Sequence, residues 1–272
     1  MLKLLTYVDT PAVLAYLNRH PIEAAFLLGN VIAYGVENRL QEGRNGDYFG
    51  YYRGPDLCGI ISFYNLGSCI LHYEHEAAID EFGALMQKRN FRIALGFRSI
   101  MTPITGYLAG RKDIREIVQC EYMLCRQFQP FILSGATFKT MAELGENRVL
   151  DFMASAYRRE WNRFNNRTEL LRLLSEHCGT EEFLFLVVKN DIKAQAYIQT
   201  TTPQVAQIGG IYTSKEQRGR GYSKAIASEF CRRIIQKGGT PSLIVKQDNL
   251  PAKRAYEYIG FTYFSDYQII RF

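Results

Sequence analysis

Glycine and arginine alternate in the segment Gln217–Ser223, which reads Gln-Arg-Gly-Arg-Gly-Tyr-Ser. A strand-like apolar run, Val205–Thr213, precedes this segment, and an amphipathic helical pattern, Ser223–Lys237, follows it. Alternate glycines allow backbone N–H groups to point into one concavity. The start of a helix adds unpaired N–H groups and the positive end of the helix dipole. The segment therefore predicts a binding site for a phosphate or pyrophosphate, with arginine side chains as additional donors.

Two common phosphate-binding motifs do not account for this segment. The chain has no Gly-x-x-x-x-Gly-Lys run followed by Ser or Thr, and Lys224 stands where the dinucleotide fingerprint needs its third glycine. A third pattern, Arg-x-x-Gly-x-Gly/Ala, is met by Arg218 and Gly221, with Ser223 in the place of Gly or Ala. In this pattern the chain resembles the GNAT superfamily, whose motif binds the pyrophosphate of acyl-coenzyme A. Because serine is small, we expect the backbone still to approach the ligand.

A second match to the same superfamily lies downstream, in Asn249–Phe261. This segment is similar to the family pattern Asn-x-x-Ala-x-x-x-Tyr-x-x-x-Gly-Phe, and it is closest to the branch that includes glycine N-acyltransferases. Asn249 is expected to cap a helix, Pro251 suits its first turn, and Gly260 is expected to end it. The order of strand, glycine turn, helix, strand and second helix supports the resemblance.

The resemblance implies transfer of an acetyl group from acetyl-CoA (or another acyl-CoA) to a primary amine of a small molecule or amino acid, by direct attack of the amine. It implies that the pantetheine amides pair with the open edge of the strand ending at Thr213, where a backbone N–H is the expected oxyanion donor. Tyr256 is the expected general acid, because a phenol with a pKa of about 10 is nearly matched to an alkyl thiol. The expected acyl-CoA contacts are Ile211, Tyr212, Thr213, Arg218, Gly219, Arg220, Gly221, Tyr222, Ser223 and Asn249.

The general base is not identified by the sequence. Val205–Thr213 contains no Asp or Glu, although many relatives place one there. Glu160 and a chain of water molecules are the two alternatives. Arg158, Arg159 and Arg163 suggest an acceptor that carries a carboxylate.

Hydrophobic periodicity predicts two halves with the same order: two helices, three strands and a helix. The polar stretch Gln127–Gly135 lies between them. In the first half we expect helices at Thr10–Leu17, Ile22–Gly35 and Glu76–Lys88, and strands at Tyr48–Arg53, Leu57–Tyr64 and Cys69–His72. In the second half we expect helices at Met141–Trp161, Thr168–His177, Ser223–Lys237 and Pro251–Ile259, and strands at Glu182–Lys189, Ala194–Thr200, Val205–Thr213, Ser242–Lys246 and Phe261–Phe272. Thr168 is the expected cap of its helix, and Asn190-Asp191 the expected hairpin turn.

The predicted fold class is α/β with a mixed sheet, and the resemblance implies two tandem GNAT-like domains. The expected division is a degenerate N-terminal domain at 1–128, a linker at 129–135 and the acyltransferase domain at 136–272. No glycine-rich turn follows the third strand of the first half, where His72-Tyr-Glu-His-Glu stands instead. We therefore expect the first half to bind no coenzyme A. For the two histidines we favour a solvated polar stretch over a metal site.

The composition is that of a globular chain with a formal net charge of +6 and dispersed charges, so we expect an anionic ligand but no nucleic-acid partner. Six scattered cysteines and the lack of a secretion signal or long apolar segment favour a cytoplasmic protein without a membrane partner or metal. We expect a monomer or a homodimer. Two alternative functions remain at this point: a catalytically silent acyl-CoA-binding sensor or scaffold, and a nucleic-acid binder.

Overall fold

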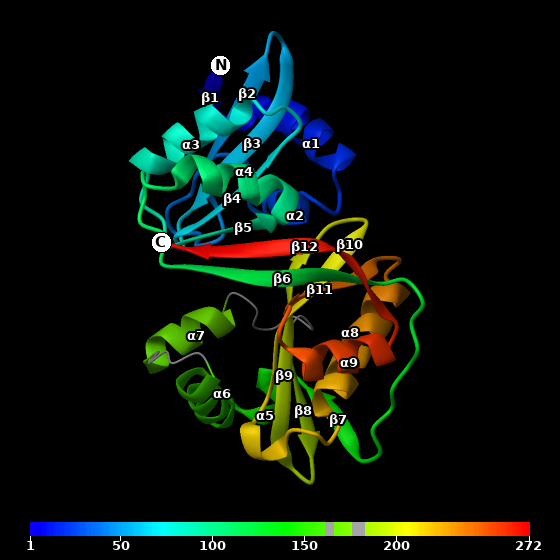
Figure 1. The fold of residues 1–272 in the computed structure, drawn as a ribbon. Coiled ribbons are helices and arrows are strands. Elements are labelled where there is room, and N and C mark those ends of the chain that lie inside the picture. Colours follow the sequence, from blue (N-terminus) through cyan, green and yellow to red (C-terminus); the bar gives the residue numbers. More distant parts are fainter. Residues whose placement is uncertain (161–165, 176–182) are drawn as a thin grey trace.

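Twelve strands form a single mixed sheet that runs through the whole molecule, with helices on both of its faces (Figure 1). The computed structural model describes residues 1–160, 166–175 and 183–272, and within these ranges it does not describe the side chains of residues 157, 159, 160, 172, 173 and 175. The order of strands across the sheet is β1-β2-β3-β4-β5-β12-β6-β11-β10-β9-β8-β7.

The N-terminal half supplies the first six strands in the chain and four α-helices. Its strands are β1 (Leu2–Leu4), β2 (Gly46–Arg53), β3 (Asp56–Tyr64), β4 (Ser68–Tyr73), β5 (Ile93–Phe97) and β6 (Glu116–Cys125). Its helices are α1 (Thr10–Arg19), α2 (Ala25–Tyr34), α3 (Ala78–Lys88) and α4 (Arg98–Leu108), and a short 3₁₀ turn covers Tyr7–Asp9.

The C-terminal half repeats this order. Its strands are β7 (Ala136–Lys139), β8 (Phe183–Val188), β9 (Asp191–Thr201), β10 (Val205–Thr213), β11 (Thr240–Lys246) and β12 (Phe261–Arg271). Its helices are α5 (Met141–Leu144), α6 (Glu146–Glu160), α7 (Arg167–Ser175), α8 (Tyr222–Gln236) and α9 (Leu250–Tyr258), with a 3₁₀ turn at Lys215–Gln217.

The last strand of each half lies in the sheet of the other half. β12 pairs with β5 on one side, and β6 pairs with β11, so that β6 and β12 lie side by side across the middle of the molecule (Figure 1). The expected division at 129–135 falls in the connection between β6 and β7. The sheet itself continues across that division, and the two-domain division stays a prediction.

Two separate hydrophobic clusters cover the two faces of the sheet in the C-terminal half. On one face, residues of α8 and α9 pack with alternate residues of β9 and β10, including Ala196, Ile198 and Ile208. On the other face, α6 and α7 pack over Phe183, Phe185 and the ring of Tyr197. Because side chains alternate along a strand, the two faces of the sheet carry separate hydrophobic clusters, one beneath α8 and α9 and one beneath α6 and α7.

Most elements agree with the periodicity of the sequence, and the differences have local causes. The expected helix Met141–Trp161 is divided at Gly145, whose φ of +83° ends α5 before α6 begins. The cap of α7 is Asn166, whose Oδ1 accepts a hydrogen bond from the N–H of Glu169 at 2.9 Å. The prediction that Thr168 caps this helix was wrong, because Thr168 lies inside it. Residues 161 and 177, the expected ends of these helices, lie outside the described residues.

The hairpin between β8 and β9 turns one residue earlier than expected. Lys189 and Asn190 both have positive φ values, of 49° and 65°, as a two-residue hairpin turn of the primed type requires. Asp191 already pairs with Val188 and belongs to β9. The strands β1, β5, β6 and β7 and the helix α4 were not predicted at all.

Candidate functional site

The site begins where two parallel strands of the C-terminal half diverge. β10 pairs with β11 from Val205–Thr240 to Ile208–Leu243, and no further along the described chain. On their other sides, β10 remains paired with β9 as far as Thr213, and β11 with β6 as far as Lys246. The edge of β10 that faces β11 is therefore without a strand partner after Ile208.

A β-bulge lies on this unpaired part of β10. Gly209 is opposite Tyr197 and Tyr212 is opposite Gln195, so two residues of β10, Gly210 and Ile211, face one residue of β9. Gly210 has a φ of +58°, and a Cβ atom there would lie 2.0 Å from the Tyr197 ring. Glycine is therefore required at this position, and the bulge turns the backbone of residues 209–212 out of the regular ladder.

The glycine turn has the geometry expected for an anion site. Gly219 and Gly221 have φ values of +78° and +81°, and Gly221 is the N-cap of α8. The first turn of α8 contains no acidic residue. Arg218 and Arg220 are exposed, and Arg218 Nε donates to the carbonyl oxygen of Thr213 at 3.3 Å. The positive end of the helix dipole and two guanidinium groups thus lie together after β10.

The two residues that follow Gly221 have different roles. Tyr222 is 8% exposed and its ring packs in the cluster beneath α8, so only its backbone N–H is left for a ligand. Ser223 Oγ lies 2.8 Å from Thr213 Oγ1, a hydrogen bond between the first turn of α8 and the end of β10. The hydroxyl of Ser223 is therefore engaged by the strand, which is how this chain accommodates serine in place of Gly or Ala.

The segment before β7 adds residues that the sequence did not indicate. A Cβ atom on Gly221 would lie 3.2 Å from the ring of Phe131, whose backbone N–H donates to Ser228 Oγ at 2.8 Å. Lys224 Nζ lies over the rings of Phe131 and Tyr258, 4.5 Å and 3.7 Å from their centroids. These cation–π contacts hold a third cation beside the N-terminus of α8.

Asn249 and Tyr256 lie on α9 and differ in exposure. Asn249 Oδ1 accepts a hydrogen bond from the N–H of Ala252 at 3.3 Å, which confirms its capping role, and its side chain is exposed. Tyr256 is 7% exposed and packs edge-to-face on Phe261. Burial raises the pKa of Tyr256 well above its ordinary value. The phenol is therefore a weaker acid than the near-match to a thiol that was expected from its unperturbed pKa.

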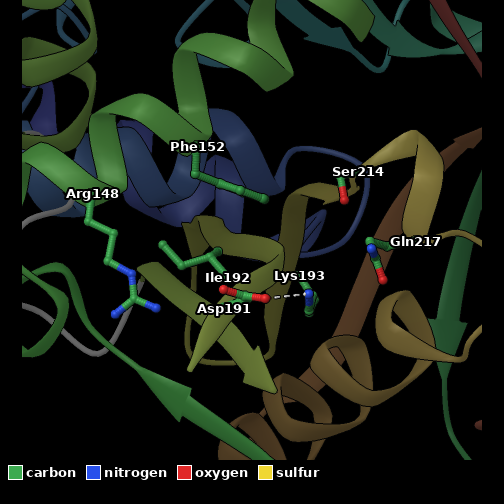
Figure 2. Close-up of a pocket in the computed structure, with 7 residues that line it drawn as sticks. All are labelled: Arg148, Phe152, Asp191, Ile192, Lys193, Ser214 and Gln217. Carbon is green, nitrogen blue, oxygen red and sulfur yellow. Dashed lines mark hydrogen bonds and ion pairs between the residues drawn. The ribbon is translucent and has the colours of Figure 1, made fainter. Parts of the chain in front are cut away.

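A groove of about 300 Å³ lies between α6, the β8–β9 hairpin and the turn after β10 (Figure 2). Arg148 and Phe152 of α6 form one wall, and Ser214 and Gln217 lie across from them (Figure 2). On its floor, Lys193 Nζ donates to Asp191 Oδ2 at 3.0 Å. The groove is polar and open, and it adjoins the glycine turn on the side away from β11.

The corresponding place in the N-terminal half has the opposite charge. α3 follows β4 as α8 follows β10, but Asp80 and Glu81 stand in its first turn and Ala77 in place of a glycine cap. Acidic side chains at a helix N-terminus compete with an anionic ligand for the same N–H groups. The residues at the N-terminus of α3 therefore do not fit a pyrophosphate.

The end of β4 is filled by a polar cluster of its own. Tyr16 Oη lies 2.7 Å from His72 Nδ1, and the ring of His20 is 4.2 Å from that of His72. His20 Nε2 lies 2.6 Å from Glu74 Oε1. Burial, together with the neighbouring His20, lowers the pKa of His72 to about 3. His72 is thus a buried neutral imidazole, which corrects the expected solvated stretch at this position.

Some predicted residues cannot be placed. The side chains of Glu160 and Arg159 and the whole of Arg163 lie outside the described residues. Arg158 is exposed on α6. Among the side chains that are described, no group of three or more His, Cys, Asp or Glu is arranged to hold a metal ion. None of the helices in the described ranges has both the length and the apolar character to cross a membrane.

Comparison with known proteins relates this site to one fold. Residues 187–269, which contain the bulge, the glycine turn and α9, match the family model described as FR47-like protein. The whole chain superposes on a GCN5-related N-acetyltransferase from Sphaerobacter thermophilus, with a TM-score of 0.66, 15% identity and coverage of 100% of this chain and 95% of the other. No curated protein sequence matches the chain significantly.

Two further structures share the full-length arrangement. A Drosophila protein gives a TM-score of 0.73 at 14% identity, over 100% of this chain and 98% of its own. A tandem GNAT protein from the clavulanic acid biosynthesis pathway gives 0.53 at 11% identity, over 99% and 97%. At these identities the likeness concerns the fold, and it confirms the predicted tandem GNAT-like architecture.

Proposed function

We propose that this chain is an N-acyltransferase that moves an acetyl group from acetyl-CoA to a primary amine of a small molecule or amino acid. The premise is its tandem GNAT-like fold, with an FR47-like region at residues 187–269. The observation that carries the proposal is the divergence of β10 from β11 directly before a glycine turn that caps α8. The unpaired edge of β10 is followed directly by the glycine turn at the start of α8. This order matches a ligand with peptide-like amides at one end and a pyrophosphate at the other.

The pyrophosphate is assigned to the N–H groups of residues 219–223 and to Arg218 and Arg220. Support comes from the two positive φ values, which aim consecutive N–H groups at one point, and from the lack of acid in the first turn of α8. Lys224, held between two aromatic rings, extends the cationic surface. Asn249 is assigned to the same ligand from its position after β11.

The pantetheine is assigned to the unpaired edge of β10 at Ile211, Tyr212 and Thr213. An extended ligand adds to such an edge by main-chain hydrogen bonds, as a further strand does. The bulge at Gly210 supports this, because it exposes backbone N–H groups that regular pairing would use. One of these N–H groups is the proposed donor to the oxyanion.

In the proposed reaction the amine attacks the thioester carbonyl, the carbon–sulfur bond breaks, and a proton from nitrogen ends on sulfur. Tyr256 is the proposed donor of the proton to sulfur. Burial raises the pKa of Tyr256, so the phenol carries its proton when the thiolate leaves, and the proton that nitrogen loses replaces it afterwards. The absence of Asp and Glu from β10 leaves the deprotonation of the incoming ammonium to water or to Glu160.

The first half is proposed to bind no coenzyme A. The acids in the first turn of α3 and the polar cluster around His72 support this assignment. The acceptor is proposed to be a small molecule that approaches under α6 and α7, and the proposal includes no nucleic-acid partner.

A second candidate, a silent acyl-CoA-binding sensor, is favoured by one observation: β10 carries no carboxylate. Two measurements separate the candidates. Calorimetry of the purified chain with acetyl-CoA tests binding, and release of coenzyme A across a panel of amines and amino acids tests turnover. The enzyme is expected to bind and to release coenzyme A in the presence of an amine, whereas binding without any amine-dependent release would support the sensor.

A further inference from the structure

A buried glutamine on β10, three residues before Gly210 of the bulge, has an unused hydrogen-bond acceptor. Gln207 is 1% exposed, and its Nε2 donates to Gln199 Oε1 on β9 at 2.9 Å. Its Oε1 is buried and has no hydrogen-bond partner. Buried polar atoms are rarely left unpaired in folded proteins, so the carbonyl oxygen of Gln207, on the strand that carries the bulge, is available to a ligand.

The side of the sheet on which this oxygen lies follows from the pairing. Ile208 is paired with Ile198, and both belong to the cluster beneath α8. Gln207, the preceding residue, therefore points to the opposite face. Gly209 pairs with Tyr197, whose ring packs under α6 and α7. The side chain of Gln207 thus lies on the face of the sheet opposite α8 and the proposed pyrophosphate site.

Close contacts surround Gln199 and the next residue of β9. A Cβ atom on Gly209 would lie 2.6 Å from Gln199 Oε1, so glycine leaves the space that the Gln199 amide occupies. The backbone carbonyl of Gln199 accepts a hydrogen bond from Arg44 of the N-terminal half. Thr200 Oγ1 donates to the carbonyl of Ala25 on α2 at 3.5 Å. In this arrangement the Nε2 of Gln207 is engaged by Gln199, and the Oε1 of Gln207 is the free end.

We infer that Gln207 Oε1 accepts a hydrogen bond from the incoming amine and positions its nitrogen for attack at the bulge. This inference rests on the proposed function and adds a positioning residue to it. A carboxamide accepts a hydrogen bond but takes up no proton in the accessible pH range. The amine must therefore react as its free base, with its lone pair forming the bond to carbon while the thiolate leaves with the electrons of the carbon–sulfur bond. The proton displaced from nitrogen ends on sulfur.

This role predicts a distinctive dependence on pH and on the amine. Because no residue of β10 takes up the proton, this role assigns its removal to water, and the rate then rises with pH toward the pKa of the acceptor amine itself. Gln207→Glu places a carboxylate at the same point, and general-base catalysis of this kind contributes at least about 10²-fold in favourable cases. We expect kcat/KM at pH 7 to rise about tenfold or more for benzylamine and glycine. For hydroxylamine, a weakly basic nucleophile that is already neutral, we expect little change.

Gln207→Met tests positioning without adding a base. We expect KM for benzylamine to rise and kcat/KM to fall about tenfold, with the affinity for acetyl-CoA unchanged by calorimetry. The matched control is Gln268→Met. Gln268 is 6% exposed on β12, its Nε2 donates to Gln119 Oε1 at 3.3 Å and its Oε1 is also unpaired. It has the same local arrangement three strands away from β10.

The outcomes separate this inference from the function on which it rests. Wild-type protein that does not bind acetyl-CoA contradicts the proposed function. Protein that binds acetyl-CoA but shows equal kinetics and equal pH profiles for wild type, Gln207→Met and Gln207→Glu overturns the role of Gln207 alone. Binding without release for any of the three amines contradicts the proposed function, and the role of Gln207 falls with it. A Gln207→Glu gain shared equally by hydroxylamine also contradicts it.

Discussion

Ser223 Oγ and Thr213 Oγ1 lie 2.8 Å apart and connect the first turn of α8 to the last residue of β10. This hydrogen bond spans the glycine turn at its base, so the two elements that would contact the ends of a pantetheine pyrophosphate are fixed to each other. The small side chain of Ser223 therefore has a hydrogen-bond partner within the chain, the hydroxyl of Thr213.

Ser223→Ala removes this hydrogen bond but keeps a small residue beside the ligand. We expect a loss of about 1 kcal/mol in the free energy of unfolding, typical for one hydrogen bond, and little change in acetyl-CoA affinity. Urea unfolding and calorimetry measure the two quantities. Thr213→Val should cause a similar loss, and the double variant should lose less than the sum of the two. A strong drop in affinity for Ser223→Ala would mean that the hydroxyl itself contacts the ligand.

Arg220→Ala removes an exposed guanidinium from the proposed pyrophosphate site. Since charge-assisted hydrogen bonds contribute about 1.5–3 kcal/mol, we expect acetyl-CoA to bind about 10- to 100-fold more weakly, with a smaller dependence on salt concentration. Arg53→Ala, an exposed arginine of the N-terminal half, is the control and should bind normally. Equal affinity of both variants would exclude Arg220 from the site.

Tyr256→Phe keeps the ring against Phe261 and removes only the hydroxyl. If the phenol protonates the leaving thiolate, turnover should fall about 10²-fold with little effect on acetyl-CoA affinity. Steady-state kinetics and calorimetry give the two values. Tyr267→Phe provides the comparison, because Tyr267 is also buried, at 3% exposure. Unchanged turnover in the Tyr256 variant would remove this residue from the mechanism.

His72 should make the protein less stable in mild acid. Its pKa is lowered to about 3 in the fold, against about 6.5 in an unfolded chain. Between these values the unfolded state binds a proton that the folded state excludes, so the free energy of unfolding falls as the pH falls below about 6.5, by up to about 1.4 kcal/mol per pH unit. His72→Phe should show a shallower decline between pH 6.5 and 4.5, by about 1 kcal/mol per unit.

The matched control for that experiment is His75→Asn, three residues further along. His75 Nδ1 accepts a hydrogen bond from the N–H of Ala77, which asparagine can replace. Denaturant unfolding at several pH values should give the wild-type slope for this variant. A wild-type slope for His72→Phe as well would show that His72 does not contribute to the acid sensitivity.

The exchanged strands predict that neither half folds alone. In a fragment of residues 1–130, β6 would lose both of its strand partners, because these are β11 and β12. In a fragment of residues 131–272, β12 would lose β5 and β6. We expect each fragment to lack cooperative unfolding by circular dichroism, and co-expression to restore it. A cooperative, monomeric C-terminal fragment would contradict the interdependence of the halves.

The sequence predicted the elements whose signals are local. Val205–Thr213 was placed with the bounds that β10 has, because apolar alternation ends there at a glycine turn. The helix α8 was placed within one residue at each end, since its apolar stripe and Gly238 define it.

The missing elements depend on distant partners. α4 contains Pro103, which argues against a helix when only neighbouring residues are considered. β6 pairs only with strands from the other end of the chain, so nothing near it in sequence indicates its place in the sheet. The amide pair of Gln199 and Gln207 is likewise created by pairing across a bulge. The glycine turn and the start of α8 could be predicted because their residues are consecutive in the sequence, whereas the two amides come from separate strands.

Titration calorimetry of the wild-type chain and of Gly221→Val with acetyl-CoA tests the central claim most directly. Gly221 caps α8 with a φ of +81°, and a β-branched residue there is strained and meets the ring of Phe131. We predict saturable binding of one acetyl-CoA per wild-type chain, and loss of most of that affinity in a variant that still unfolds cooperatively. No binding to the wild-type chain, or equal binding to the folded variant, would contradict the assignment of the pyrophosphate to this turn.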